Sequence, residues 1–120
     1  MDGSLTSCSE PGPDVLGLPA LAVTGELDLA VAPWLREQLA ALFVGGAASI
    51  VVDLSHATFL DSTALGVLVQ ALNQSRELGG QVHLVVQEPQ ILRVLTTTGL
   101  DVEFSLHHDV TELHNGRNDQ

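Results

Sequence analysis

The sequence predicts an α/β fold in which helices pack on a small, mainly parallel β-sheet. Two short runs rich in β-branched residues, 48–54 and 81–86, have the composition of buried strands. Between and after these runs, apolar residues recur three and four positions apart, which is helical spacing. Strands that alternate with helices are joined by crossover connections, and such connections favour parallel neighbours.

The N-terminal part is predicted to lead into the first strand of the sheet. Residues 1–13 are rich in Ser, Gly and Pro, so we expect a flexible N-terminus or an edge strand near 5–9, before a turn at 11–14. A strand is predicted over 15–24. Pro19 lies within it and has no N–H to donate, which indicates a sheet edge or a bulge.

A first helix is predicted over about 30–43. Asp28 is expected to cap it, Pro33 falls in its first turn, and Gly45-Gly46 ends it. Its inward stripe is predicted to consist of Trp34, Leu35, Leu39 and Leu42.

A second helix is predicted directly after the strand at 48–54 and a turn at 55–57. Gly79 and Gly80 are expected to end this helix with positive φ. Its polar face contains Gln70, Asn73, Gln74 and Glu77. Its apolar face is predicted to contain Ala64, Leu65, Val67, Leu68, Ala71, Leu72 and Leu78.

The remaining elements are shorter. The strand at 81–86 is followed by a third helix from Pro89 to a stop at Gly99. A last strand is predicted over 102–106 and a short helix over 109–113. Residues 114–120 are expected to be a polar C-terminal tail.

Composition indicates one globular domain. The 120 residues are 45% hydrophobic, which is enough to bury a normal core. No run approaches the roughly 20 apolar residues of a membrane span, and no secretory signal pattern begins the chain. The single cysteine, Cys8, excludes an internal disulfide, so we expect a cytoplasmic protein.

The charge balance argues against several classes of partner. Fifteen acidic residues face four basic ones, giving a formal net charge of −11. Such a surface repels phosphate backbones and anionic lipids, so direct nucleic-acid or membrane binding is not expected. The acidity suits either a partner with a basic face or solubility alone.

The most informative segment is Phe59–Gly66, which joins a buried strand to an apolar helix. Asp61 or Ser62 is expected to be the N-cap, where a side-chain oxygen accepts from an orphan backbone N–H. An exposed hydroxyl at this position serves either as a cap or as a phosphoacceptor, because a helix N-terminus also stabilises a phosphate. Local geometry alone leaves both interpretations open.

Three segments resemble one known family. Asp-Ser-Thr-Ala-Leu-Gly at 61–66 resembles the Asp-Ser-(Ser/Thr)-Gly-Leu-Gly signature of anti-sigma factor antagonists, members of the STAS domain family. Val-Thr-Gly-Glu-Leu-Asp at 23–28 is similar to a second signature of that family, and 91–100 is similar to its segment of a hydrophobic helix followed by Gly-Leu. The resemblance spans 14–113, which is therefore expected to be a single STAS domain.

The resemblance implies a fold, a function and a set of site residues. The fold would be a small mixed sheet with its helices on one side. The function would be that of an anti-sigma factor antagonist, which binds an anti-sigma factor serine kinase, releases a sigma factor and is switched off by phosphorylation at Ser62. A serine phosphatase would reverse the switch. The partner-binding residues would be Asp28, Leu60, Asp61, Ser62, Thr63, Ala64 and Leu65.

One residue departs from the family pattern, and the resemblance allows one alternative function. Ala64 stands where the family has Gly, which adds a methyl group where a kinase must approach, and Thr63 offers a second hydroxyl. The alternative function is that of a STAS domain that serves as a constitutive subunit of a lipid or anion transporter. That subunit would need no phosphorylation.

Other chemistry finds little support in the sequence. Asp28 and Asp61 could pair for acid–base work, but capping explains both. Ser62 with His56 as a base would suggest a hydrolase, yet the Gly-x-Ser-x-Gly elbow is missing. The five histidines do not show the spacing of a metal-binding motif. We therefore expect no catalytic residue, no metal and no cofactor, and the protein would be a substrate rather than an enzyme.

Overall fold

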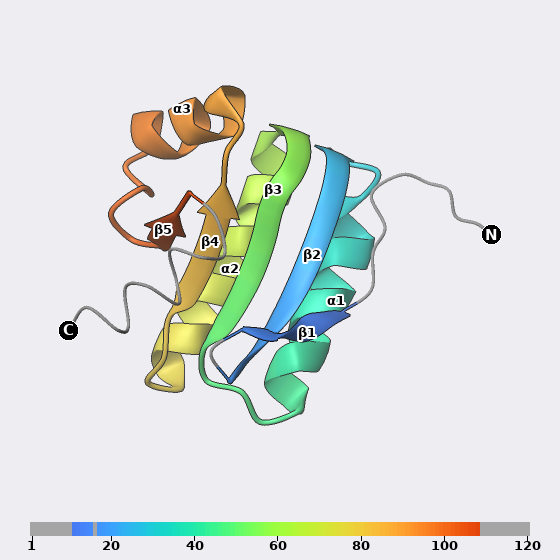
Figure 1. Ribbon diagram of the computed structural model, residues 1–120, viewed down its shortest axis with the longest axis vertical. Helices are drawn as coiled ribbons and strands as arrows, with labels where there is room; N and C mark the ends of the chain where they lie inside the picture. The colour runs from blue at the N-terminus through green and yellow to red at the C-terminus, as the bar shows by residue number, and fades with distance from the viewer. Residues whose placement is uncertain (1–10, 16, 109–120) are drawn as a thin grey trace.

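A computed structural model describes residues 11–15 and 17–108, and it has the predicted α/β architecture (Figure 1). Five strands and three helices alternate for most of this length. In chain order they are β1 (Pro11–Val15), β2 (Leu18–Leu27), α1 (Ala32–Val44), β3 (Ile50–Leu60), α2 (Ser62–Glu77), β4 (Val82–Val86), α3 (Pro89–Thr97) and β5 (Ser105–His107).

The sheet is mixed and mostly parallel. Its strands lie in the order β1-β2-β3-β4-β5, so neighbours in sequence are neighbours in space. β1 pairs antiparallel with β2, whereas β2, β3, β4 and β5 are parallel to one another. Each parallel step needs a crossover, and α1, α2 and α3 supply these crossovers.

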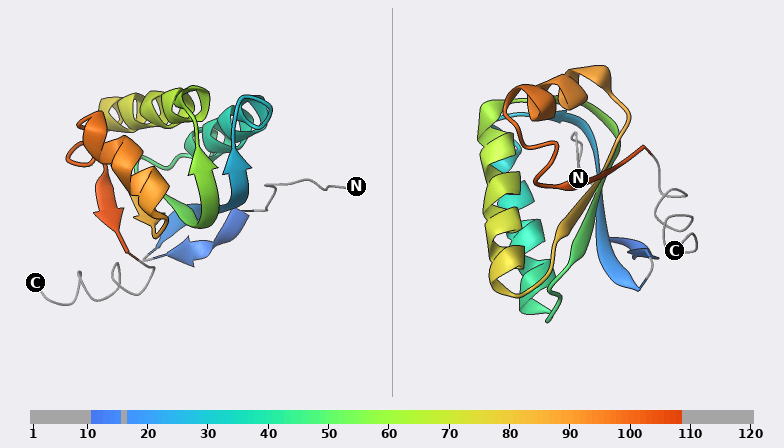
Figure 2. Two further views of the ribbon diagram at one scale, coloured as in Figure 1. Left: turned by 90° about the horizontal axis from the view of Figure 1, so that it is seen from above. Right: turned by 90° about the vertical axis from the view of Figure 1, so that its left-hand side faces the viewer.

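The helices cover one face of the sheet, as predicted (Figure 2). Alternation along β3 explains why: Ile50, Val52 and Leu54 point into the main core, which also contains residues of all three helices. Val51 points to the opposite face, where it packs with Ala20 and Val85 in a much smaller cluster. The carboxyl ends of β2 and β3 therefore meet the amino ends of α1 and α2 at one end of the molecule (Figure 1).

The predicted boundaries were wrong at the start of the sheet. Residues 11–15 form the edge strand β1 rather than a turn, while 5–9 lie outside the described residues. β2 begins later and ends later than the predicted 15–24, and it is an interior strand. Pro19 is nevertheless accommodated by an irregularity, because the β1–β2 register shifts between Gly12 and Val15, opposite this residue.

The predicted boundaries were also wrong further along the chain. β3 extends to Leu60, so 55–57 belong to a strand and not to a turn, because β2 continues to pair with them. The last strand is 105–107 instead of 102–106, and Val102 is 78% exposed. The expected helix at 109–113 and the tail at 114–120 lie outside the described residues.

The first two helices need smaller corrections. In α1 the buried positions are Ala32, Leu35, Leu39 and Phe43, while Trp34 and Leu42 are only half-buried at the margin of the core. In α2 the apolar face is as predicted up to Leu72, but Leu78 is the C-cap and is half-exposed.

The two glycines after α2 end the helix for different reasons. Gly79 has a positive φ of 85°, as expected. Gly80 instead allows a close approach, since a Cβ there would lie 2.2 Å from the Ala48 carbonyl oxygen. The buried Ser75 hydroxyl donates to that same oxygen at 2.6 Å. This contact therefore ties the end of α2 to the start of β3.

Candidate functional site

The β3–α2 corner presents Ser62 at the first position of a helix. Asp61 has extended backbone angles (φ −98°, ψ 178°), and its Oδ1 accepts from the Ala64 N–H at 3.0 Å. Asp61 is therefore the N-cap, and Ser62 is not needed for capping. The Ser62 side chain is exposed to solvent. Of the two residues that the sequence left open, the structure assigns the cap to Asp61.

Hydrogen bonds from two backbone N–H groups hold this corner from opposite sides. On the β2 side, Leu27 is the register partner of Leu60, and the Asp61 N–H donates to the Leu27 carbonyl at 3.0 Å. On the other side, the Leu60 N–H donates to Oε1 of Gln90 at 3.2 Å. Sequence reasoning missed Gln90, which lies 30 positions away in the first turn of α3 and belongs to no motif.

Asp28 lies beside this corner but does not cap α1 as predicted. Its Oδ1 accepts from the Ala30 N–H at 3.1 Å, and its carbonyl accepts from the N–H groups of Val31 and Ala32 at 3.0 and 3.1 Å. The helix begins at Ala32, with Val31 as an N-cap that makes no side-chain bond. Asp28 therefore shapes a turn. Because Leu27 pairs with Leu60, this turn is adjacent to the Ser62 corner.

Three of the residues expected to contact a partner are in the core. Leu60, Ala64 and Leu65 are 1%, 0% and 8% exposed. The expectation that their side chains form a contact surface was wrong, since they support the corner from inside. The burial of Ala64 also corrects a second expectation, because its methyl group packs in the core and does not stand in the path of a kinase.

Different residues form the exposed surface at this end. Ser62 and Thr63 are exposed, and Asp28 and Asp61 are half-buried. Two large apolar side chains accompany them: Leu29 is 68% exposed in the turn after β2, and Phe59 is 38% exposed near the end of β3. The exposed Glu26 is the register partner of Phe59. We call Leu29, Phe59, Ser62 and Thr63 the corner surface.

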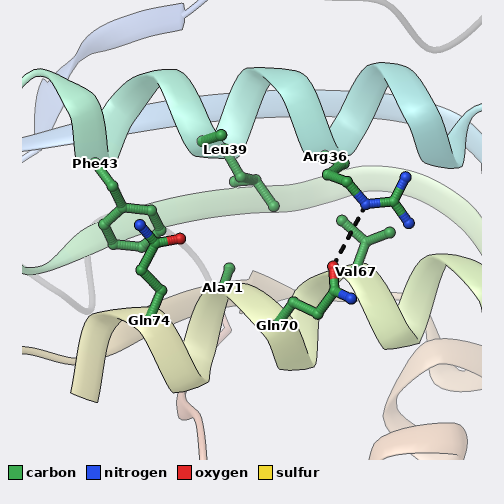
Figure 3. A pocket seen from close by; sticks show the side chains of 8 residues that line it. Arg36, Leu39, Phe43, Val67, Gln70, Ala71 and Gln74 are labelled. Atoms are coloured by element: carbon green, nitrogen blue, oxygen red, sulfur yellow. Dashed lines mark hydrogen bonds between the residues drawn. The ribbon is translucent and has the colours of Figure 1, made fainter. Parts of the chain in front are cut away.

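Behind the corner, α1 and α2 run side by side with a small groove between them (Figure 3). Leu39, Phe43, Val67 and Ala71 form its apolar floor. At one end Nε of Arg36 donates to Oε1 of Gln70 at 3.4 Å. The lining contains no carboxylate, thiol, hydroxyl or imidazole, so we assign it a packing role.

In the described part of the chain, the histidines do not belong to a group of side chains that could hold a metal ion. His56 lies in β3, and its Nδ1 is 3.4 Å from the Ser55 hydroxyl oxygen, so Ser55 rather than Ser62 is its hydrogen-bond partner there. Across residues 11–15 and 17–108 no three His, Cys, Asp or Glu side chains converge to hold a metal ion. Within the same residues, no helix is long and apolar enough to cross a membrane.

A histidine pair occupies the sheet face that the helices leave uncovered. Nδ1 of His83 on β4 lies 3.2 Å from Nε2 of His107 on β5. Burial, together with the nearby His107, lowers the pKa of His83 below its ordinary value of 6.5. This pair is on the β4–β5 side of the sheet, away from the corner surface.

Comparison with known proteins identifies the class. A family model described as the STAS domain matches residues 13–113, so the chain belongs to the STAS domain family. The anti-sigma-B factor antagonist of Bacillus subtilis (strain 168) is 35% identical over 78 residues, which are 65% of this chain and 71% of that protein. The anti-sigma-B factor antagonist of Listeria monocytogenes is 30% identical over 93 residues, covering 78% of this chain and 75% of that protein.

A solved structure agrees with this assignment. The crystal structure of an anti-sigma factor antagonist from Mycobacterium paratuberculosis superimposes with a TM-score of 0.78 and 27% sequence identity, covering 94% of this chain and 93% of that one. The predicted STAS fold is thus confirmed, and the relatives are named as anti-sigma factor antagonists.

Proposed function

We propose that this protein is an anti-sigma factor antagonist that binds an anti-sigma factor when Ser62 is unmodified and is switched off when Ser62 is phosphorylated. The observation that carries the proposal is the corner geometry: Asp61 satisfies the cap, and Ser62 is left exposed and free of a capping role. The two relatives named anti-sigma-B factor antagonist support the same function.

The electrostatics of the corner suit such a switch. A phosphate on the first helical residue lies among backbone N–H groups that lack intrahelical partners, at the positive end of the helix dipole. The fold therefore tolerates the modification. The phosphate also adds about −1.5 to −2 charges next to Asp61. The changed property is thus the charge of the docking surface and not the stability of the domain.

The docking surface follows from exposure. Leu29 supplies exposed apolar area in the turn after β2, and Phe59 supplies more near the end of β3, while Thr63 is exposed and Asp28 is half-buried. Buried apolar anchors carry most of the energy of a typical protein interface, whereas charges at its rim mainly affect the association rate. The net charge of −11 favours a partner with a basic face.

The partners follow from this switch. The anti-sigma factor would be a serine kinase that uses ATP to modify Ser62, and a serine phosphatase would restore the binding-competent form. Both would meet the protein in the cytoplasm. The protein would be the substrate of these enzymes and would catalyse nothing itself.

Phosphate mapping tests the proposal. The full chain is incubated with the anti-sigma factor kinase and ATP, and the product is mapped by mass spectrometry. One phosphate on Ser62 is expected. Modification of Thr63 with Ser62 unmodified would contradict the assignment of the acceptor. A chain that binds its partner without ever being modified would favour the constitutive transporter subunit.

A further inference from the structure

The corner that carries Ser62 lies where β3 has lost one of its two strand neighbours. β4 ends at Val86, and the last register pair between β3 and β4 is Leu54 with Val86. β3 continues for six more residues, to Leu60. In the described part of the chain no strand pairs with that edge of β3 beyond Leu54. The amides on this edge therefore need acceptors other than a strand.

Gln90 supplies such an acceptor at Leu60, the last residue of β3. Successive amides of a strand point in opposite directions, so the Asp61 N–H points to β2 and bonds to Leu27, and the Leu60 N–H points to the open side. There Oε1 of Gln90 accepts from it at 3.2 Å. A side-chain amide thus takes the place of the missing strand immediately before the cap residue.

Gln90 is itself held in place by the start of α3. Glu88 is the N-cap of that helix, and its carboxylate accepts from the Gln90 backbone N–H at 3.2 Å. The next residue, Ile91, is fully buried in the main core. The Gln90 side chain is half-buried, which limits its freedom. The acceptor is therefore anchored by a capped helix start and by a buried neighbour.

We propose that Gln90 is the positioning residue that holds the β3–α2 corner in the geometry required for phosphoryl transfer to Ser62. This inference rests on the proposed function. In the transfer, the Ser62 hydroxyl oxygen forms a bond to the γ-phosphorus of ATP. The bond from that phosphorus to the bridging oxygen breaks, ADP leaves, and a base on the kinase takes the hydroxyl proton. The rate of such a step depends on alignment of the attacking oxygen, and small displacements are costly.

Three variants separate this role from a general structural one. Gln90→Met keeps the length of the side chain and removes the acceptor. Gln90→Glu keeps an acceptor oxygen and is expected to rescue. Gln87→Met is the matched control, because Gln87 is an exposed amide three residues earlier in the same connection. Thermal melting of each full chain verifies that it is folded.

Two readouts are needed, and the first requires no kinase. Amide hydrogen exchange, measured by NMR, should become about fivefold faster at Leu60 in Gln90→Met, as expected from the loss of one hydrogen bond of about 1 kcal/mol. Gln90→Glu and Gln87→Met should retain the parent rate. In the kinase reaction, Gln90→Met should lower kcat for Ser62 about tenfold with KM within about twofold, because the exposed docking residues are unchanged.

The outcomes are distinct. An unchanged Leu60 exchange rate in Gln90→Met would overturn the inference whatever the kinase does. Faster exchange with unchanged kinetics at Ser62 would also overturn it, because the corner would then be loosened without effect on the transfer. If the parent is not phosphorylated at Ser62, the proposed function fails and the role in transfer fails with it, while the exchange rates still show whether Gln90 holds Leu60.

Discussion

Two strand-to-helix connections lie side by side at one end of the sheet and begin alike. Leu27 ends β2, Leu60 ends β3, the two are register partners, and an aspartate follows each of them. After β3, Asp61 caps α2 at once, and the helix starts at the next residue. After β2, the Asp28 carboxylate bonds to the Ala30 N–H, and α1 starts four residues later.

The different lengths and hydrogen bonds of the two connections suit them to different roles. The short β3–α2 corner is bonded on both sides and capped, so it presents Ser62 in a defined position. The longer β2–α1 connection leaves Leu29 exposed. We infer that the first corner carries the modified residue and that the second supplies apolar contact area. Variants in the two connections can test this division.

The largest effect is expected from charge at Ser62. Ser62→Asp should weaken binding to the anti-sigma factor by about 3–4 kcal/mol, a several-hundred-fold change in Kd. Ser62→Ala should bind at least as well as the parent. Both should melt within a few degrees of the parent, because Asp61 is the cap. Calorimetric titration measures the affinities.

The control for charge alone is Asn73→Asp, which adds the same charge at an exposed position far along α2. Its affinity should be close to that of the parent. Equal loss of binding in Asn73→Asp and Ser62→Asp would show that net charge matters and that the corner does not.

The next comparison sets a buried leucine against an exposed one. Leu60→Ala should lower the free energy of unfolding by about 2–5 kcal/mol, because it leaves a cavity in the core. Leu29→Ala should change it by less than about 0.5 kcal/mol. Leu29→Ala should nevertheless weaken partner binding by about 1 kcal/mol or more, because Leu29 is an exposed apolar residue in the turn adjacent to the Ser62 corner. Urea denaturation measures the free energy of unfolding, and calorimetric titration measures the affinity for the partner. An affinity of Leu29→Ala equal to that of the parent would show that Leu29 is not in the interface.

Features set by local sequence periodicity could be predicted, whereas features set by the three-dimensional arrangement could not. The strand at 48–54 and the apolar face of α2 follow from local periodicity, so their existence was predictable. Asp28 and Asp61 each follow the last residue of a strand, and the sequence led to a capping prediction for both; the helix starts at once after Asp61 but only after a turn at Asp28. Sequence reasoning could not assign Leu29 and Phe59 to the surface, because an apolar residue is by default expected in a core.

The third prediction compares the two aspartates directly. Asp61→Ala should cost about 1 kcal/mol of unfolding free energy through loss of its bond to the Ala64 N–H. Asp28→Ala should cost about 0.5 kcal/mol or less, because its carboxylate bonds within an exposed turn. Chemical denaturation of the two variants resolves the difference. Equal costs would mean that the Asp28 turn supports α1 as strongly as the cap supports α2.

The smallest effect is expected in the pH dependence of the melting temperature. It should come from the His83–His107 pair on β4 and β5, away from both connections. Burial and His107 lower the pKa of His83, so in the folded state this residue binds fewer protons than in the unfolded chain. It therefore favours the folded state fully above about pH 6.5, and this contribution is lost as the pH falls through the lowered pKa. The melting temperature of the parent should fall between about pH 7 and 5, and that of His83→Gln should fall less. His56→Gln, which removes an exposed ring, should follow the parent. Parallel losses in all three proteins would mean that the effect of acid does not come from His83.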